Sequence, residues 1–158
     1  MPKPGPEHEL LKQSEGVWDT VSEFTEQPGA PTMTSKGVGT VTMGGGGFWA
    51  IGDFKGDFAG EPFHGHSVDG YDQGKKKYVS LWVDSMASYM AVFEGDYDKE
   101  KKLLTMTTET PDPVTGKLMK WKGVTHFIDK DNHTWTGYMP TPDGKEFASM
   151  KVTYKRKK

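Results

Sequence analysis

From residue 16 to the C-terminus, apolar and polar side chains alternate along the chain, and short turn sequences interrupt the alternation at regular intervals. Alternation with a period of two is typical of β-strands that have one buried and one solvent-facing side. On this basis we predict about ten strands. They cover residues 16–26, 33–43, 47–58, 62–71, 76–84, 88–97, 102–109, 117–128, 132–140 and 145–156.

The connections between these strands are short and contain residues that favour tight turns. Examples are the glycines 44–47, Asp72 to Lys75 and Thr141 to Lys145. Glycine, proline, aspartate and asparagine are common in such turns, and connections this short make neighbouring strands antiparallel. A meander of ten strands leaves two unpaired edges unless it closes on itself. The sequence therefore predicts an all-β fold, a single antiparallel up-and-down barrel.

The residues before the first strand have a different pattern, typical of a short helix. Pro6 and acidic residues open the segment, Leu10 and Leu11 give it an apolar side, and Gly16 follows its end. A chain of 158 residues has about the length of one ordinary domain. We therefore expect a single domain over residues 1–158, with the N-terminal segment and helix in 1–15 and the barrel in 16–156.

Charge and composition restrict the partners that we expect. The formal net charge is −2, and Arg156 is the sole arginine among 20 basic residues, so we expect no nucleic-acid partner. The chain has no cysteine, which excludes disulfides and thiolate metal sites. Neither a signal peptide nor an apolar run of membrane-spanning length is present, so we expect a soluble, cytoplasmic protein. An exported precursor stays open if the chain has been trimmed.

The sequence Gly16-Val17-Trp18, directly after the predicted helix, resembles the signature of the calycins. In that signature the tryptophan packs at the closed end of the barrel beneath a basic residue of the last strand, and Arg156 stands at the matching position. From about residue 4 to 158 the chain also resembles a calycin-related bacterial family, domain of unknown function 1579. The resembling segments include Gly70-Tyr-Asp, Trp82-Val-Asp-Ser-Met, Glu94-Gly-Asp-Tyr-Asp and Pro142-Asp-Gly-Lys-Glu-Phe. The resemblance implies a barrel like those of lipocalins and fatty-acid-binding proteins, with Gly16, Trp18 and Arg156 as structural residues.

Such a barrel points to a cavity as the working part, and aromatic and methionine side chains are suited to its wall. If Trp18 faces inward, Phe24 does too, whereas both sides of residues 76–84 are compatible with burial. Our leading hypothesis is a binding protein, not an enzyme, for a small hydrophobic ligand. The candidate ligand-binding residues are Trp82, Met90, Met106, Trp135 and Phe24. Ordinary core packing would also explain these side chains.

An enzyme working in the same cavity is the alternative. Asp84 and Glu94 are the candidate acids, although an aspartate at a strand end also commonly accepts hydrogen bonds from turn amides. His64 and His66, two residues apart on one strand, are candidates for a zinc site, because both would project to the same side. Exposed histidines are the simpler explanation. The candidates for a third ligand are His126, His133, Asp84 and Glu94.

A haem-binding barrel is the second alternative, since some calycins bind haem through a histidine of the barrel wall. The last predicted strand, 145–156, contains no histidine, which weakens this comparison. The sequence requires no cofactor, so zinc and haem remain open alternatives.

Overall fold

The computed structural model describes residues 1–158 and contains one α-helix, one 3₁₀ turn and ten strands. The elements are α1 (Pro6–Lys12), β1 (Gly16–Thr25), β2 (Thr32–Gly44), η1 (Gly45–Gly47), β3 (Trp49–Phe58), β4 (Glu61–Asp72), β5 (Lys77–Asp84), β6 (Ala91–Asp98), β7 (Leu103–Pro111), β8 (Leu118–Asp129), β9 (Asn132–Pro140) and β10 (Glu146–Arg156). No helix has the length and apolar character needed to span a membrane.

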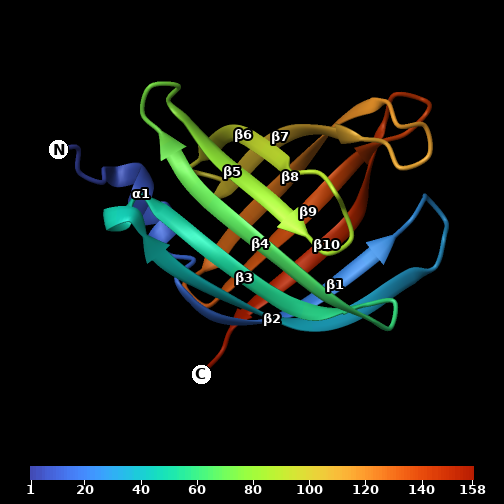
Figure 1. The fold of residues 1–158 in the computed structure, drawn as a ribbon, viewed down its shortest axis with the longest axis horizontal. Coiled ribbons are helices and arrows are strands. Elements are labelled where there is room, and N and C mark those ends of the chain that lie inside the picture. The colour runs from blue at the N-terminus through green and yellow to red at the C-terminus, as the bar shows by residue number, and fades with distance from the viewer.

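Each strand pairs antiparallel with its neighbours in sequence, and β1 pairs with β10 to close the barrel (Figure 1). The pairing of β1 with β10 is continuous, from Trp18 opposite Arg156 to Phe24 opposite Met150. The predicted all-β, up-and-down barrel with a short N-terminal helix is therefore confirmed. Because the sheet has no free edge, every strand is hydrogen-bonded on both sides.

Two strands, β3 and β6, begin more than one residue later than the sequence pattern predicts. The strand expected from residue 47 begins at Trp49, because the glycines of η1 have φ angles of 57°, 71° and 91° and form a tight turn instead. The strand expected from residue 88 begins at Ala91. Residues 85–90 form a loop whose first turn is held by Asp84, which accepts a hydrogen bond from the backbone N–H of Met86 at 2.8 Å.

The register of β4 against β5 settles which side of residues 76–84 faces inward. Ser80 lies opposite Asp69, and Trp82 lies opposite Ser67, so these four side chains share one side of the sheet. All four line the cavity inside the barrel. The inward side of β5 is thus the more polar one, which also carries Asp84.

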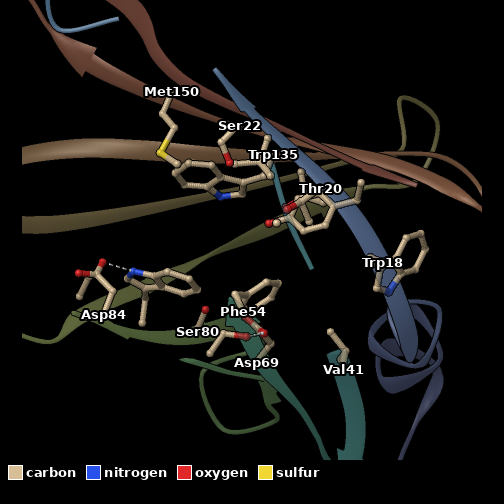
Figure 2. A pocket seen from close by; sticks show the side chains of 18 of the residues that line it. Trp18, Thr20, Ser22, Val41, Phe54, Asp69, Ser80, Asp84, Trp135 and Met150 are labelled. Carbon is tan, nitrogen blue, oxygen red and sulfur yellow. Dashed lines mark hydrogen bonds between the residues drawn. The ribbon is translucent and has the colours of Figure 1, made fainter. Parts of the chain in front are cut away.

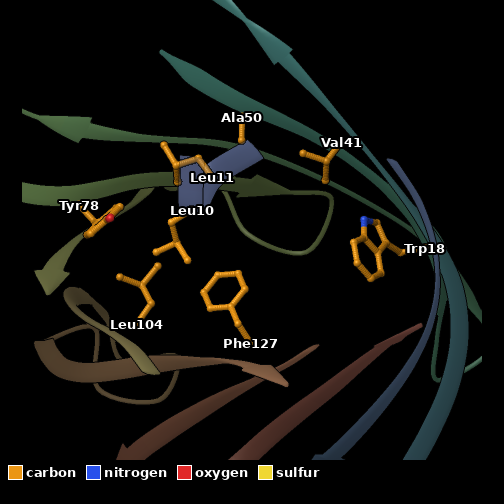
Figure 3. Packing of buried hydrophobic residues seen from close by; sticks show 8 residues of the cluster. All are labelled: Leu10, Leu11, Trp18, Val41, Ala50, Tyr78, Leu104 and Phe127. Atoms are coloured by element: carbon orange, nitrogen blue, oxygen red, sulfur yellow. The ribbon is translucent and has the colours of Figure 1, made fainter. Parts of the chain in front are cut away.

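One end of the barrel is filled by a cluster of buried apolar side chains beneath α1 (Figure 3). Trp18 is the most deeply buried of them, with 1% of its surface exposed. Its indole N–H donates a hydrogen bond of 2.9 Å to the carbonyl of Ser14, just after the helix. The cluster consists of Leu10, Leu11, Trp18, Val41, Ala50, Tyr78, Leu104 and Phe127. We call this end the closed end.

Arg156 ties the helix to the barrel at the closed end. Its guanidinium lies 4.2 Å from the centre of the Trp18 ring and donates hydrogen bonds to the carbonyls of Gln13, Glu15 and Lys130. A Cβ atom at Gly16 would overlap this guanidinium, and Gly16 has a φ of 134°. The structure thus brings the three residues of the calycin-like signature into contact at one point of the fold.

Candidate functional site: a cavity inside the barrel

A cavity with a volume of about 450 Å³ occupies the barrel interior beyond the closed-end cluster (Figure 2). Its wall draws side chains from all ten strands, and most of them are hydrophobic. The loop of residues 85–90 contributes Met86 and Tyr89, which are 58% and 42% exposed. These two side chains both touch the cavity and reach solvent, so we call this end of the barrel the open end.

Aromatic rings form much of the wall. The rings of Phe54 and Trp82 lie 5.5 Å apart between centroids, and Trp121 lies 6.2 Å from Trp135. The Trp135 ring covers Gly123, where a Cβ atom would come within 2.6 Å of the indole nitrogen. A Cβ at Gly65 would likewise overlap the Trp82 ring. Glycine beneath each indole lets the ring lie flat against the wall, which leaves the centre of the barrel open.

Asp84 fixes one of these rings at the open end. Its Oδ2 accepts a hydrogen bond of 2.6 Å from the indole N–H of Trp82, the dashed line at Asp84 in Figure 2. Its Oδ1 accepts a hydrogen bond from the Met86 backbone N–H. Both carboxylate oxygens therefore have protein donors. The arrangement agrees with an aspartate that shapes a strand end, and it positions Trp82 rather than presenting a free acid to the cavity.

A second carboxyl group, Asp69 on β4, lies deeper in the cavity and was not among the sequence candidates. The hydroxyl of Ser67 donates a hydrogen bond of 2.8 Å to Asp69 Oδ2. Burial raises the pKa of Asp69, while hydrogen bonds from Ser80 and Ser67 act in the opposite direction. The pKa of Tyr154, on β10, is raised by burial and by the negative charge of Asp69. Asp69 is thus an interior acid within electrostatic reach of a phenol.

His133 lies where the cavity meets the closed-end cluster. Its ring is 4.5 Å from that of Trp18 and stacks on Tyr154 at 4.4 Å. Burial, with a smaller contribution from the positive charge of Arg156, lowers the pKa of His133 to about 4. The imidazole is therefore neutral at neutral pH and serves as part of an aromatic stack.

Four of the five predicted ligand-binding residues line the cavity: Phe24, Trp82, Met106 and Trp135. The fifth, Met90, is not part of the wall and is 55% exposed. It precedes β6, whose inward side begins at Ala91, so the period-two pattern that assigned Met90 to a strand does not apply to it.

Of the candidate metal ligands, Asp84 and His133 line the cavity, whereas His64, His66, His126 and Glu94, which is also the second candidate acid, point away from it. His64 and His66 are exposed on the outer side of β4, with ring centroids 6.4 Å apart and Asp53 as the acidic neighbour of His66 at 3.6 Å. His126 is exposed on β8. Glu94 faces solvent on β6 and pairs with Lys75 at 3.1 Å. No three His, Cys, Asp or Glu side chains are grouped so that they could hold a metal ion.

A closed antiparallel barrel with a helix over one end and a ligand-sized cavity defines a calycin-like protein. The chain belongs to the family described as "Protein of unknown function (DUF1579)", which matches residues 3–156. No curated protein matches the sequence at a significant level.

Two solved structures are similar to the chain over nearly their whole length. Rv2717c from M. tuberculosis superposes with a TM-score of 0.69 at 11% sequence identity, covering 98% of this chain and 99% of that chain. The S-type phycobiliprotein lyase CPES from Guillardia theta superposes with a TM-score of 0.60 at 13% identity, covering 95% of this chain and 92% of that one. At these identities the similarity establishes the fold alone.

Proposed function

We propose that this protein binds a small, largely apolar molecule in the barrel cavity. The observation that carries the proposal is the cavity itself, with a volume of about 450 Å³ and walls of aromatic, aliphatic and methionine side chains. Binding sites for small molecules typically have volumes of roughly 300–1,000 Å³ and mostly apolar walls with a few polar groups. The interior has both properties, because Ser67, Asp69 and Ser80 supply the polar groups.

The placement of the rings supports an open rather than a self-filled interior. Trp82 and Trp135 lie flat over Gly65 and Gly123, and Trp82 is held in that position by Asp84. A ligand therefore meets preorganised aromatic faces, which reduces the entropy lost on binding. A ligand would enter at the open end, beside the loop 85–90, because the other end is occupied by the closed-end cluster.

The test is a fluorescence titration with the uncharged probe N-phenyl-1-naphthylamine on the wild-type protein and two variants. Ser22→Trp places an indole into the cavity from β1, where Ser22 lines the wall (Figure 2). Glu23→Trp places the same indole on the outer side of the same strand, because Glu23 is exposed. Circular dichroism verifies that both variants fold.

We expect saturable binding by the wild type and Glu23→Trp, and an affinity at least about tenfold lower for Ser22→Trp, since its indole occupies the space that the probe needs. If the wild type does not bind the probe, or if the probe binds both variants equally well, an interior binding site is excluded.

A further inference from the structure

Asp69 is the feature of the cavity that an apolar ligand alone does not explain. It lies on β4 beside Ser80 and Phe54, as Figure 2 shows, and Ser80 is its register partner across the sheet. Ser67, two residues earlier on the same strand, is hydrogen-bonded to it. Burial of a carboxylate is costly unless a positive charge or several donors compensate it. A barrel that only had to hold hydrocarbon would be more stable with an apolar residue at this position.

No cationic side chain pairs with Asp69. The seven ion pairs of the structure all involve other residues, and none of them is inside the barrel. Two lysines contribute to the wall, but both are exposed: Lys36 on β2 and Lys55 on β3, whose Nζ lies 3.8 Å from Asp53. The interior histidine, His133, is held neutral by burial, with the charge of Arg156 acting in the same direction.

The groups around Asp69 suit a ligand that carries a positive charge and hydrogen-bond donors. The Ser67 hydroxyl donates a hydrogen bond to Asp69 Oδ2, and the hydroxyl of Ser80, which lies opposite Asp69, also lowers the pKa of the carboxyl group. A carboxylate accepts up to about four hydrogen bonds, so sites remain for donors from a ligand. Aromatic faces, which attract cations, lie close by: Phe54 is 5.5 Å from Trp82 and 6.2 Å from Tyr154 between ring centroids.

We propose that Asp69 anchors a cationic nitrogen, so that the ligand class of this cavity is a small lipophilic amine or another protonated nitrogen compound. This inference rests on the proposed function. The ammonium or iminium N–H groups donate to Asp69, and the apolar part of the ligand lies along Phe54, Trp82 and the rings toward the open end. An anionic amphiphile, such as a fatty acid, is disfavoured because it brings no positive charge to compensate the buried carboxyl group of Asp69.

The test compares two compounds with the same bicyclic ring, 1-naphthalenemethylamine, which is a cation at neutral pH, and the neutral 1-naphthalenemethanol. Displacement of N-phenyl-1-naphthylamine gives the affinity of each. The proteins are the wild type, Asp69→Asn, which keeps the size of the side chain but removes its charge, and Asp53→Asn, which removes an acid from the outer side of β3. The wild-type comparison does not depend on the folding of any variant.

We expect the amine to bind the wild type and Asp53→Asn about tenfold more tightly than the alcohol, because charge-assisted hydrogen bonds are the stronger ones. In Asp69→Asn the preference for the amine should fall to less than about twofold, with the affinity for the alcohol and for the fluorescent probe retained. A wild-type protein that binds the probe but does not prefer the amine overturns this inference and leaves the proposed function standing. A preference that survives in Asp69→Asn also overturns it. Failure of all three compounds to bind overturns both.

Discussion

At the closed end of the barrel, side chains from the helix and the strands fill the interior, and Trp18 is 1% exposed. At the open end, the same strands surround a cavity, and Met86 remains 58% exposed at its rim. Arg156 donates hydrogen bonds to three backbone carbonyls in two chain segments at the closed end, whereas Asp84 positions a single ring at the open end. Side chains at the closed end therefore contact one another and the backbone, whereas side chains at the open end surround a cavity.

This difference indicates how one small barrel can be both stable and hollow. Burial of apolar surface stabilises a fold in proportion to the area removed from water, and a cavity removes part of that contribution. Close packing at one end, together with a sheet that has no free edge, offsets the loss at the other. Substitutions at the closed end should consequently change stability most, and substitutions at the open end should change binding most.

The largest effect on stability is expected for Trp18→Ala. Removing a fully buried tryptophan lowers the free energy of unfolding by about 3–5 kcal/mol. Trp82→Ala at the open end should cost roughly half of that or less, because the Trp82 ring faces the cavity on one side. Urea unfolding of both variants gives the comparison. Equal losses would show that the two ends do not differ in their contribution to stability.

The pH dependence of stability should trace to His133 next to the closed-end cluster. Its pKa is lowered from 6.5 to about 4, so the folded state favours the neutral ring. Its contribution is fully present above pH 6.5 and is lost as the pH falls from 6.5 toward 4. At about 1.4 kcal/mol per pKa unit, the loss is on the order of 3 kcal/mol.

Unfolding curves between pH 7 and pH 4 for the wild type, His133→Phe and His64→Phe measure this loss. The His133→Phe variant should lose clearly less stability on acidification than the wild type, and His64→Phe, which changes an exposed ring, should follow the wild type. An unchanged pH dependence in His133→Phe would contradict a neutral, buried imidazole.

The smallest effect is expected for Asp84→Ala. This change removes the acceptor for the indole N–H of Trp82 and for the Met86 backbone N–H, so Trp82 becomes mobile at the rim. We expect about a threefold lower affinity for N-phenyl-1-naphthylamine and a loss of stability of about 1 kcal/mol. Asp53→Ala on the outer side serves as the control for removal of an acid. An Asp84→Ala variant with unchanged affinity would exclude Trp82 from the binding surface.

The barrel was predictable because its determinants are local or repeat along the chain. The alternation of apolar and polar residues predicted the strands, and the short turns predicted that neighbouring strands are antiparallel. Gly16, Trp18 and Arg156 indicated where the first and last strands of the barrel meet. The helix and all ten strands are present, with differences of a few residues at their ends, because residues 47–48 and 88–90, which were predicted as strand, lie before β3 and β6.

The sequence did not predict Asp69 as a site residue, because on β4 polar side chains face the interior and an apolar side chain faces solvent. Ser67 and Asp69 face inward, whereas Val68 faces outward and is 36% exposed, so hydrophobicity along β4 does not indicate the inner side. The two histidines of β4, His64 and His66, are on its outer side. The register with β5, which places Ser80 opposite Asp69, identifies this carboxyl group as interior. A signal was available in the alternation itself, since Gly65, Ser67, Asp69 and Tyr71 share one side.

Backbone hydrogen exchange with and without N-phenyl-1-naphthylamine tests most directly whether the ligand binds at the open end and leaves the closed end unchanged. The account predicts slower exchange on binding in residues 80–91 and in other strand segments at the open end, with residues 6–18 unchanged. Slower exchange concentrated in residues 6–18, with residues 80–91 unaffected, would contradict it.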